Sequence, residues 1–395
     1  MGEPIRILNV VGRMDRGGIE TLIMNIYRNI DRDKVQFDFL AHYGKLDADY
    51  NEEIRDLGGR IYEMPVIKTT EKAYYSRIFK YIAALKRFFK EHPEYRIVHG
   101  HMTNTASIYM PIAKKYGNVE CCIAHSHLAQ TQKSAGKFTN ILTDILRKPL
   151  KKHTTDLFAC SEAAAAWLFP REDIENGRIR YVHNGVNTDV FCYDLFKRDN
   201  AREKLGISHG RTVIGHVGRF YHPKNHEFII EVFEQYIKID PNAVLLLVGG
   251  GELMPEIQQL VKNKGLENSV IFTGVRSDVA DLMQAMDLFL MPSRYEGLPV
   301  VGIEAQASGL PCLFSNAVPD EVDITGRCLF LDLNQSASVW ADNIVSLLKK
   351  YYESDRTATQ QEVINAGYDI KQVAKDMQEF YLMHHYDREV VTNKQ

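Results

Sequence analysis

The sequence predicts an α/β protein made of two doubly wound domains, each built on a parallel β-sheet. Short apolar, β-branched runs alternate with longer amphipathic runs along the 395 residues, a pattern typical of βα units. The chain is also longer than one compact domain usually runs. The first strand and a strand near residue 212 both end in Val-Gly-Arg, so the two halves begin with the same turn.

The expected strands lie at residues 5–11, 35–41, 97–101, 120–124, 212–217, 243–248, 270–273, 288–291 and 311–314. We assign residues 1–187 to an N-terminal Rossmann-like domain and residues 205–369 to a C-terminal one. The polar, interrupted stretch from Asn184 to about Gly210 is expected to connect them. A last amphipathic run, from about 370 to 395, has no strand after it, and we expect it to pack back on the N-terminal domain.

The composition argues against several classes of protein. The chain is 45% hydrophobic and 25% charged, with a formal net charge of −3, which argues against nucleic acid as the main partner. No apolar run approaches the roughly 18 residues of a membrane span, and the first residues form neither a signal peptide nor a myristoylation signal, so we expect a cytoplasmic protein. Six cysteines lack CxxC spacing and are expected to be reduced and mostly buried.

Two loops could hold phosphate. Gly17 and Gly18 open the first expected helix, and bare amides at a helix N-terminus can approach an anion closely. Their spacing fits neither GxGxxG nor a Walker loop, and a plain tight turn is the alternative. In the second half, Arg219 and Lys224 follow the C-terminal end of a strand. Two cations there would suit a diphosphate, and solvated surface charges are the alternative.

The segment YEGLPVVGIE places Glu296 and Glu304 on either side of a helix start expected at Pro299. With a rise of about 1.5 Å per residue plus a turn, the carboxylates should lie on the order of 10 Å apart. This separation is wide for a glycosidase pair and wrong for a shared metal. Two solvated glutamates are the alternative, but we interpret them as two ends of one ligand site.

Backbone amides lie between these two carboxylates, at Leu298, Val300 and Val301. Amides at a helix N-terminus would suit a diphosphate. A ligand with a diphosphate in the middle and hydroxyls at each end is a nucleoside diphosphate sugar. Glu304 would then bind the ribose and Glu296 the sugar.

Several motifs make the chain resemble the retaining glycosyltransferases of family 4, which have the GT-B fold, in which two Rossmann-like domains face a central cleft. In chain order, these motifs are Gly17-Gly18-Ile19-Glu20, Asn184-Gly185-Val186, Gly218-Arg219 with Lys224, Glu296 with Glu304, and Gly309-Leu310-Pro311. Asn225 departs from the glycine that the family commonly has after the lysine, and we expect it to cap the next helix. The downstream segment PDEVDIT resembles members from exopolysaccharide and capsule clusters.

The resemblance implies sugar transfer with retention at the anomeric carbon, without a metal, a cofactor or a side-chain nucleophile. The implied catalytic residues are Glu296, Lys224, Arg219 and His125. The implied donor-binding residues are Gly17, Gly18, Gly297, Leu298, Val300, Glu304, Val275 and Arg276. His127, His101 and Asn184 are assigned to the acceptor side or the cleft. We expect the leaving diphosphate to help take the acceptor's proton, while cations and amides stabilise its negative charge.

Four histidines follow two expected strands as His-x-His pairs, namely His99, His101, His125 and His127. Residues two apart face the same way, so the four imidazoles could converge on a metal. No acidic cluster nearby completes a hydrolase-type site, so we expect no metal. A hydrogen-bonded structural role is favoured for His99 and His101. The resemblance places His125 near the reacting carbon of the donor sugar, with His127 as the second choice.

Two basic amphipathic runs suit an anionic bilayer surface. Residues 77–90 contain five basic residues and no acidic one, and residues 133–153 contain six lysines and arginines with Asp144 as the one acidic residue. Solvated lysines on helices that pack against the sheet are the alternative. The hypothesis is peripheral attachment at the inner face of the plasma membrane, near a lipid-linked acceptor.

Other classes of protein compete with this interpretation. A sugar-nucleotide epimerase of the same fold would release free sugar from the donor without an acceptor. A phosphorylase would need a lysine-bound pyridoxal phosphate. A non-catalytic subunit that binds donor or lipid is a third alternative, which the intact set of motif residues makes less attractive.

Overall fold

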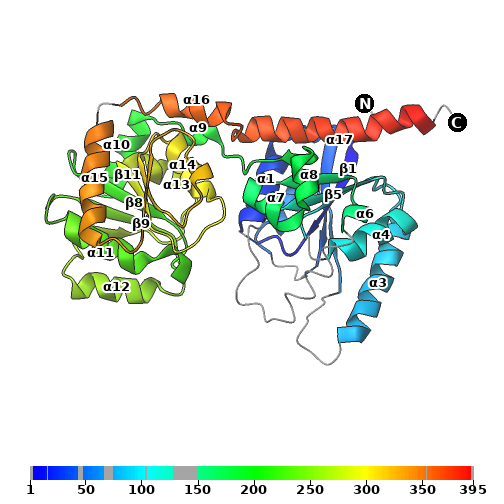
Figure 1. The fold of residues 1–395 in the computed structure, drawn as a ribbon, viewed down its shortest axis with the longest axis horizontal. Helices are drawn as coiled ribbons and strands as arrows, with labels where there is room; N and C mark the ends of the chain where they lie inside the picture. Colours follow the sequence, from blue (N-terminus) through cyan, green and yellow to red (C-terminus); the bar gives the residue numbers. More distant parts are fainter. Residues whose placement is uncertain are drawn as a thin grey trace. The chain divides into compact units, whose positions relative to one another are not determined.

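The computed structural model describes residues 3–15, 17–42, 48–65, 74–102, 105–127, 150–352 and 354–392. They form two compact units (Figure 1): unit 1 comprises Met1–Gly185 and Ile370–Gln395, and unit 2 comprises Val186–Asp369. Each unit contains one sheet. The predicted fold class, α/β with two Rossmann-like domains, is therefore confirmed.

Unit 1 has a seven-stranded sheet in the order β3-β2-β1-β4-β5-β6-β7, in which every pair is parallel. Its strands are β1 (Ile5–Val11), β2 (Val35–Ala41), β3 (Ile61–Glu63), β4 (Ile97–Gly100), β5 (Cys121–Ser126), β6 (Asp156–Ala159) and β7 (Ile179–Tyr181). Its helices are α1 (Gly18–Asn29), α2 (Asn51–Asp56), α3 (Tyr74–Glu91), α4 (Ala106–Tyr116), α6 (Leu150–His153), α7 (Glu162–Leu168), α8 (Arg171–Glu175) and α17 (Ile370–Thr392). The strand order reverses between β1 and β4, and the carboxyl ends of strands at such a switch point are where open α/β sheets bind ligands.

Both faces of this sheet are covered, which explains the continuous apolar character of its strands. Ile7 and Val11 of β1 belong to one apolar core, whereas Leu8 and Val10 belong to the other. Successive side chains of a strand point to opposite faces, so a helix layer on each side requires apolar residues at nearly every position.

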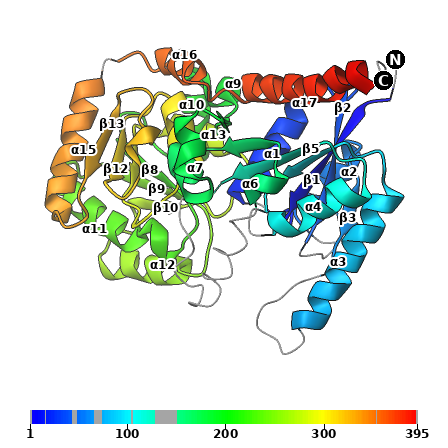
Figure 2. The ribbon, with the colours of Figure 1, turned by 45° about the vertical axis from the view of Figure 1, so that its right-hand side comes forward.

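The last helix, α17, packs against α1, β1 and β2 of unit 1 and runs along the top of that unit in Figures 1 and 2. Its buried side chains Ala374, Met377, Phe380 and Tyr381 join the core that contains β1 and β2. Tyr381 packs edge-on against Phe37, with 5.8 Å between the ring centroids. The C-terminal end of the chain therefore completes the first unit.

Unit 2 has a six-stranded sheet in the order β10-β9-β8-β11-β12-β13, again with parallel pairs. Its strands are β8 (Val213–Val217), β9 (Val244–Val248), β10 (Val270–Phe272), β11 (Leu288–Met291), β12 (Cys312–Ser315) and β13 (Cys328–Leu331). Its helices are α9 (Thr188–Phe191), α10 (Leu195–Lys204), α11 (His226–Tyr236), α12 (Met254–Asn263), α13 (Val279–Ala285), α14 (Val300–Ala307), α15 (Ala337–Tyr351) and α16 (Ala358–Asn365), with short 3-10 turns at His222–Lys224 and Asp320–Val322. The order of strands reverses between β8 and β11.

The stretch that we expected to connect the domains is folded into unit 2. Its polar residues form α9 and α10, and both helices lie within Val186–Asp369. Arg198 and Arg202 of α10 each form an ion pair with Asp287, at 2.5 and 2.7 Å. The expectation of a linker was wrong because α10 is attached largely through charged groups, so its sequence lacks the apolar stripe that indicates a packed helix.

Four strands were not expected from the sequence: β3, β6, β7 and β13. Each contains three or four residues, and three of the four lie at sheet edges. Such short segments are too brief for an alternation of apolar and polar residues to be recognised.

Two expectations from the composition concern the state of the cysteines and the presence of membrane-spanning helices. All six cysteines are free thiols, and burial raises the pKa of Cys122 to about 12, which keeps its thiol unreactive at neutral pH. None of the helices within the described ranges combines the length and the apolar character needed to cross a membrane.

Candidate functional site

In unit 2, the loops that follow β8 and β11 bring two charged side chains together. Lys224 Nζ lies 2.6 Å from Glu296 Oε1, and the two side chains are only 20% and 13% exposed. Because β8 and β11 are parallel neighbours, these loops leave the same edge of the sheet. The pair places a cation and a carboxylate where a ligand would bind.

The two loops are also tied through their backbones. Asn225 adopts a left-handed conformation with φ of 58°, and its Nδ2 donates to Pro292 O at 3.1 Å. The Arg294 N–H donates to Pro223 O at 2.7 Å. Asn225 precedes α11, but its side chain makes no capping hydrogen bond. The expected cap was therefore wrong, because the Asn225 amide holds the neighbouring loop instead.

Gly218 and Arg219 follow β8 directly. A Cβ on Gly218 would lie 2.8 Å from His216 Nε2, so the close approach of the loop to this ring requires glycine. His216 is fully buried and lies 2.8 Å from Leu290 O through Nδ1. Burial lowers the pKa of His216 well below its ordinary value, so the loop rests on a neutral ring. Arg219 is exposed to solvent.

The turn between the two glutamates leads into α14. The helix begins at Val300, and Pro299 precedes it without a side-chain capping bond, so the predicted start is one residue early. Gly297 is exposed, and Leu298 and Val300 are partly buried. A helix start without a side-chain cap carries positive potential from its first amides, which suits an anionic ligand.

Glu304 lies inside α14 and is partly buried. Burial raises the pKa of its carboxyl to about 7. A carboxyl of this kind is close to half protonated at neutral pH, so a ligand that prefers the ionised form shifts its titration. Perturbed carboxyl groups of this kind gather at functional sites.

The loops after β9 and β10 leave the same edge of the sheet. Gly249 has φ of 138°, and a Cβ there would overlap with Gly218 O, so the loop after β9 packs on the loop after β8. Val275 is 76% exposed. Arg276 forms two hydrogen bonds with Asp278, at 2.7 and 2.6 Å. The predicted donor-binding residues Val275 and Arg276 therefore lie at this edge, with the arginine already engaged.

In unit 1, the first turn brings a carboxylate over the predicted phosphate loop. Gly17 precedes α1, and Gly18 is its first residue. A Cβ on Gly17 would overlap with Glu20 Oε2, whereas one on Gly18 would meet no atom within 4 Å. Burial raises the pKa of Glu20. An anion that binds at this helix start would compete with the Glu20 carboxyl, a feature that the sequence did not reveal.

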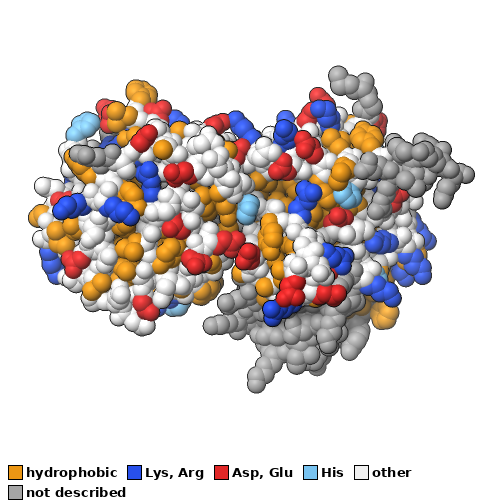
Figure 3. Space-filling model, turned by 45° about the horizontal axis from the view of Figure 1, so that its top comes forward, with side chains coloured by type: hydrophobic (Ala, Val, Ile, Leu, Met, Phe, Trp, Pro, Cys, Tyr) orange, Lys and Arg blue, Asp and Glu red, His pale blue; other side chains and the backbone are white. Residues whose placement is uncertain are grey.

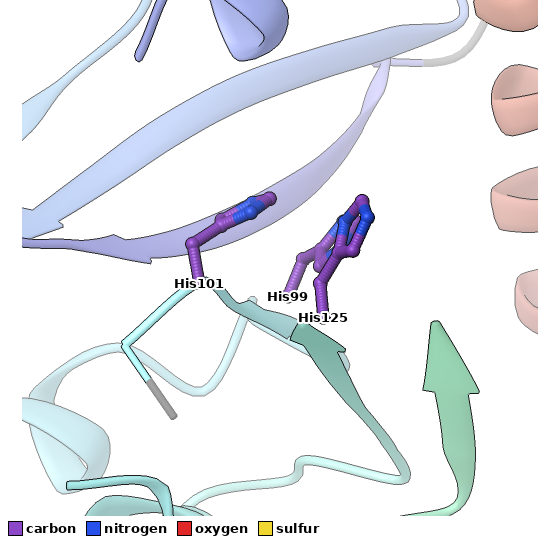
Figure 4. Close-up of side chains that lie close together, drawn as sticks. All are labelled: His99, His101 and His125. Carbon is purple, nitrogen blue, oxygen red and sulfur yellow. The ribbon is translucent and has the colours of Figure 1, made fainter. Parts of the chain in front are cut away.

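The carboxyl edge of the same sheet holds the four histidines. Figure 4 shows three of them, with the ring of His101 pointing toward those of His99 and His125. His99 Nε2 lies 3.1 Å from His125 Nδ1, and these two rings are nearly parallel, at 14°, with centroids 5.2 Å apart. His101 Nδ1 lies 2.9 Å from His127 Nε2. The spacing fits imidazoles that bond edge to edge, one pair joining His99 to His125 and the other joining His101 to His127.

All four rings are neutral at neutral pH. Burial lowers the pKa of His99 and of His127 to about 3, and it lowers the pKa of His101 and His125 well below the ordinary value. Neighbouring imidazoles lower the pKa of His99, His101 and His125 further. A charged imidazolium here would lose its hydration without gaining a counter-ion.

The arrangement also bears on the question of a metal. His99, His101 and His125 bring one ring nitrogen each within 4.8 Å of one another, a spacing that imidazole ligands can adopt. The second nitrogen of His99 lies 2.7 Å from Tyr381 Oη, and that of His101 lies 3.2 Å from Asn9 Oδ1. A metal would have to displace imidazole–imidazole hydrogen bonds that already engage these rings. Metal independence stays a prediction.

Asn184 was assigned to the acceptor side. It lies at the end of unit 1, and its Oδ1 is buried without a hydrogen-bond partner in the described part of the chain. An unpaired buried amide oxygen of this kind is available to a ligand hydroxyl.

Two residues of the histidine cluster were missed from the sequence, namely Asn9 and Tyr381. Asn9 is an isolated polar residue within the apolar strand β1, and it is 1% exposed. That isolation was a signal, because buried amides need partners. Tyr381 belongs to an ordinary amphipathic helix and carried no signal of its own.

Two Rossmann-like domains, with a lysine–glutamate pair beside an uncapped helix start in the second, are the features expected of a glycosyltransferase with the GT-B fold. Residues 16–190 match the description "Glycosyltransferase Family 4", and residues 211–350 match "Glycosyl transferases group 1". The chain is 33% identical to the putative glycosyltransferase EpsF of Bacillus subtilis (strain 168), over 93% of this chain and 94% of that protein. It belongs to glycosyltransferase family 4.

More distant relatives agree with this assignment. The capsular polysaccharide biosynthesis glycosyltransferase CapH of Staphylococcus aureus is 22% identical over 96% of this chain and 99% of its own length. The crystal structure of Anabaena Alr3699/HepE in complex with UDP has a TM-score of 0.74 at 17% identity, covering 95% of this chain and 99% of that one. The likeness to HepE shows a shared fold.

Proposed function

We propose that this glycosyltransferase moves a sugar from a nucleoside diphosphate sugar to a hydroxyl of a glycan or lipid-linked acceptor, in the assembly of an exopolysaccharide or capsule. The Lys224–Glu296 pair, 2.6 Å apart beside the start of α14, carries this proposal. The names of EpsF and CapH support the glycosyltransferase class and, for CapH, the capsule. Structures of HepE with UDP and with UDP-glucose support the class of donor.

Unit 2 is proposed to bind the nucleotide and the diphosphate. The diphosphate would lie between Lys224, Arg219 and the first amides of α14, because these groups supply positive potential. Glu296 would keep its contact with the lysine through one carboxylate oxygen and accept sugar hydroxyls with the other. Glu304 would accept the ribose hydroxyls, with Val275 and Arg276 beside the base.

We propose retention at the anomeric carbon without a metal. The acceptor hydroxyl would attack from the face that the diphosphate leaves, and the departing diphosphate would help take its proton. Lys224, Arg219 and the α14 amides would stabilise the negative charge that develops on the leaving group. In unit 1, His125 is proposed to bind the donor sugar, and His101, His127 and Asn184 to serve the acceptor side.

A donor screen followed by a transfer assay tests this proposal. A nucleotide sugar that binds the native chain should raise its melting temperature, and mass spectrometry should then show a glycosylated acceptor and free nucleoside diphosphate. Release of free sugar at the same rate with and without an acceptor would instead indicate an epimerase. Failure of every nucleotide sugar to stabilise the chain would contradict the assignment of the donor.

We further propose peripheral contact with an anionic membrane, because α3 and α4 form a basic surface. Three ammonium groups, those of Lys86, Lys90 and Lys115, lie within 5.7 Å of the centre of the Tyr116 ring, and Phe79 is 70% exposed. Figure 3 shows Lys and Arg side chains gathered at the right-hand edge of unit 1. A cationic surface with an exposed aromatic ring suits anionic headgroups.

The opposite face of α3 supports the alternative interpretation of residues 77–90, in which the helix packs against the sheet. On that face, Tyr81, Leu85 and Phe89 are buried in a core of unit 1. One helix can serve both roles, with an apolar face on the sheet and a basic face toward lipid. Most of the second basic run, residues 133–153, lies outside the described residues.

A further inference from the structure

One of the two imidazole chains in unit 1 begins on the last helix. Tyr381 Oη of α17 lies 2.7 Å from His99 Nδ1, and His99 Nε2 lies 3.1 Å from His125 Nδ1. The far nitrogen of this chain, His125 Nε2, is buried without a hydrogen-bond partner in the described part of the molecule. A chain of two hydrogen bonds therefore connects a helix distant in sequence to an unpaired atom at the carboxyl edge of the sheet.

The tyrosine hydroxyl determines which atom is the donor in each of these two hydrogen bonds. Tyr381 is 1% exposed, and burial raises its pKa well above the ordinary value, so the hydroxyl keeps its proton. If Tyr381 Oη–H donates to His99 Nδ1, the proton of neutral His99 lies on Nε2 and donates to His125 Nδ1. The proton of neutral His125 then lies on Nε2.

The opposite direction leaves more groups unpaired. His125 Nδ1–H would donate to His99 Nε2, and His99 Nδ1–H would donate to Tyr381 Oη. The Tyr381 O–H hydrogen and the His125 Nε2 lone pair would then both lack a partner among the described residues. The first direction also leaves one donor unpaired, His125 Nε2–H, but this atom lies at the carboxyl edge of the sheet, where a substrate oxygen can accept from it. The second direction leaves the Tyr381 hydrogen inside the apolar core of unit 1. A donor that stays buried without an acceptor is costly, so the first direction is favoured.

We propose that Tyr381 and His99 are positioning residues, which hold His125 in the Nε2–H tautomer and so present a neutral N–H donor to an oxygen of the sugar substrate. This inference rests on the proposed function, in which His125 binds the donor sugar. A neutral donor suits this task because the anomeric centre becomes positively charged as a glycosidic bond breaks. An imidazolium would repel that charge, whereas the N–H of a neutral ring orients the sugar without opposing it.

Nuclear magnetic resonance of the full-length chain with 15N-labelled histidine tests the tautomer directly. We expect a protonated Nε2 and a bare Nδ1 for His125, identified by the loss of its signals in His125→Gln. Tyr381→Phe removes one oxygen and should convert this ring into a mixture of both tautomers. A protonated Nδ1 in the unmodified chain would overturn the inference, and this result does not depend on the variant folding.

Tyr27→Phe is the matched control. Tyr27 is a buried tyrosine of the same apolar core, and its hydroxyl donates to Gln36 Oε1 at 2.5 Å rather than to a histidine. We expect this variant to leave the His125 tautomer unchanged. If Tyr27→Phe and Tyr381→Phe alter the His125 signals equally, the hydroxyl of Tyr381 has no specific role.

Steady-state kinetics distinguish a positioning role of Tyr381 through His125 from a general effect of the substitution on the structure. Tyr381→Phe should lower kcat for transfer by about two- to tenfold with little change in the donor KM, and the effect should disappear in a His125→Ala background. An equal loss in both backgrounds would overturn the role through His125. If the unmodified chain transfers sugar from no nucleotide donor, the proposed function fails and the role toward the sugar fails with it, whereas the tautomer measurement still tests whether Tyr381 and His99 hold His125 in the Nε2–H form.

Discussion

The candidate groups at the carboxyl edges of the two sheets differ in charge, because those of unit 2 are ionised and the histidines of unit 1 are neutral. Unit 2 presents a partly buried Lys224–Glu296 pair and the start of α14, whereas unit 1 presents four imidazoles that burial keeps neutral. Charged groups and helix amides suit a diphosphate, and neutral donors and acceptors suit hydroxyls. Under the proposed function, this difference assigns the diphosphate to unit 2 and sugar hydroxyls to unit 1.

The largest effect is expected at the charged pair. Glu296→Ala and Lys224→Ala should each lower kcat/KM for transfer by roughly 100- to 1,000-fold, because the first removes the group that positions the sugar and the second removes charge stabilisation of the leaving diphosphate. Steady-state transfer assays measure the loss, and circular dichroism checks the fold. Glu267→Ala, at an exposed glutamate elsewhere in unit 2, is the control. Near-normal turnover in either variant would remove the pair from the mechanism.

The next largest effect is expected on the salt dependence of donor binding, which should differ between substitutions in unit 2 and in unit 1. Arg219→Ala should weaken donor binding about tenfold and flatten its decrease with ionic strength, because exposed charges are screened by salt. His125→Ala should leave the salt dependence as steep as in the unmodified chain, since that ring carries no charge. Calorimetric titrations at low and high salt measure both slopes. Equal flattening in the two variants would break the comparison between the units.

Glu304 gives a pH dependence of known sign. Its carboxyl pKa is raised to about 7, and ribose hydroxyls favour the ionised form. Donor affinity should therefore rise about tenfold between pH 6 and pH 8, following the ionised fraction. Calorimetry at the two pH values checks this rise, and Glu304→Gln should bind weakly and without it. A rise of the same size in Glu304→Gln would assign the titration to another group.

The same carboxyl affects stability in the opposite direction. Because its folded pKa is raised, its stabilising contribution is complete below the unfolded value, near 4.3, and is lost as the pH rises through about 7. At pH 8, Glu304→Gln should therefore be more stable than the unmodified chain, by roughly 3 to 4 kcal/mol. Urea unfolding at pH 8 and pH 4 measures the difference, which should fall to a few tenths of a kcal/mol at the lower pH, below the unfolded pKa.

The smallest effect is expected at the basic surface of unit 1. Lys90→Gln should weaken binding to anionic vesicles about fivefold, because each lysine near such a surface contributes about 1 kcal/mol. Phe79→Ser should weaken it by a similar factor, because it removes an exposed aromatic ring that can insert among the headgroups. Flotation with phosphatidylglycerol vesicles at moderate salt measures the bound fraction. Tyr352→Ser, at a ring of unit 2 that is 86% exposed, should have no effect. Absence of the unmodified chain from the lipid fraction would favour a soluble acceptor.

Much of the fold was accessible from the sequence, because it depends on local patterns. β1, β2 and β11 begin and end at the predicted residues, since their apolar runs are long or sharply bounded. The short edge strands and the polar helix α10 were not recognised. Their formation depends on a neighbour in the sheet, or on a distant partner such as Asp287.

In the candidate site, too, some features could be predicted from the sequence and others could not. The helix start after Pro299 could be placed within one residue, because proline and glycine mark turns locally. The direct Lys224–Glu296 contact joins residues 72 positions apart, and the sequence indicated only that both could serve one ligand. The role of the Asn225 side chain was predicted wrongly, because its partner Pro292 lies on another loop.

By itself, the sequence determined two doubly wound domains and the residue types of the candidate site, because strand alternation, glycine turns and helix starts act over a few residues. Only the tertiary structure decided that Tyr381 would meet His99 across 282 positions, and that burial would leave four imidazoles neutral. Such contacts depend on how α17 packs on unit 1, and desolvation depends on everything that surrounds a group. Neither these long-range contacts nor the extent of desolvation can be inferred from a local pattern of residues.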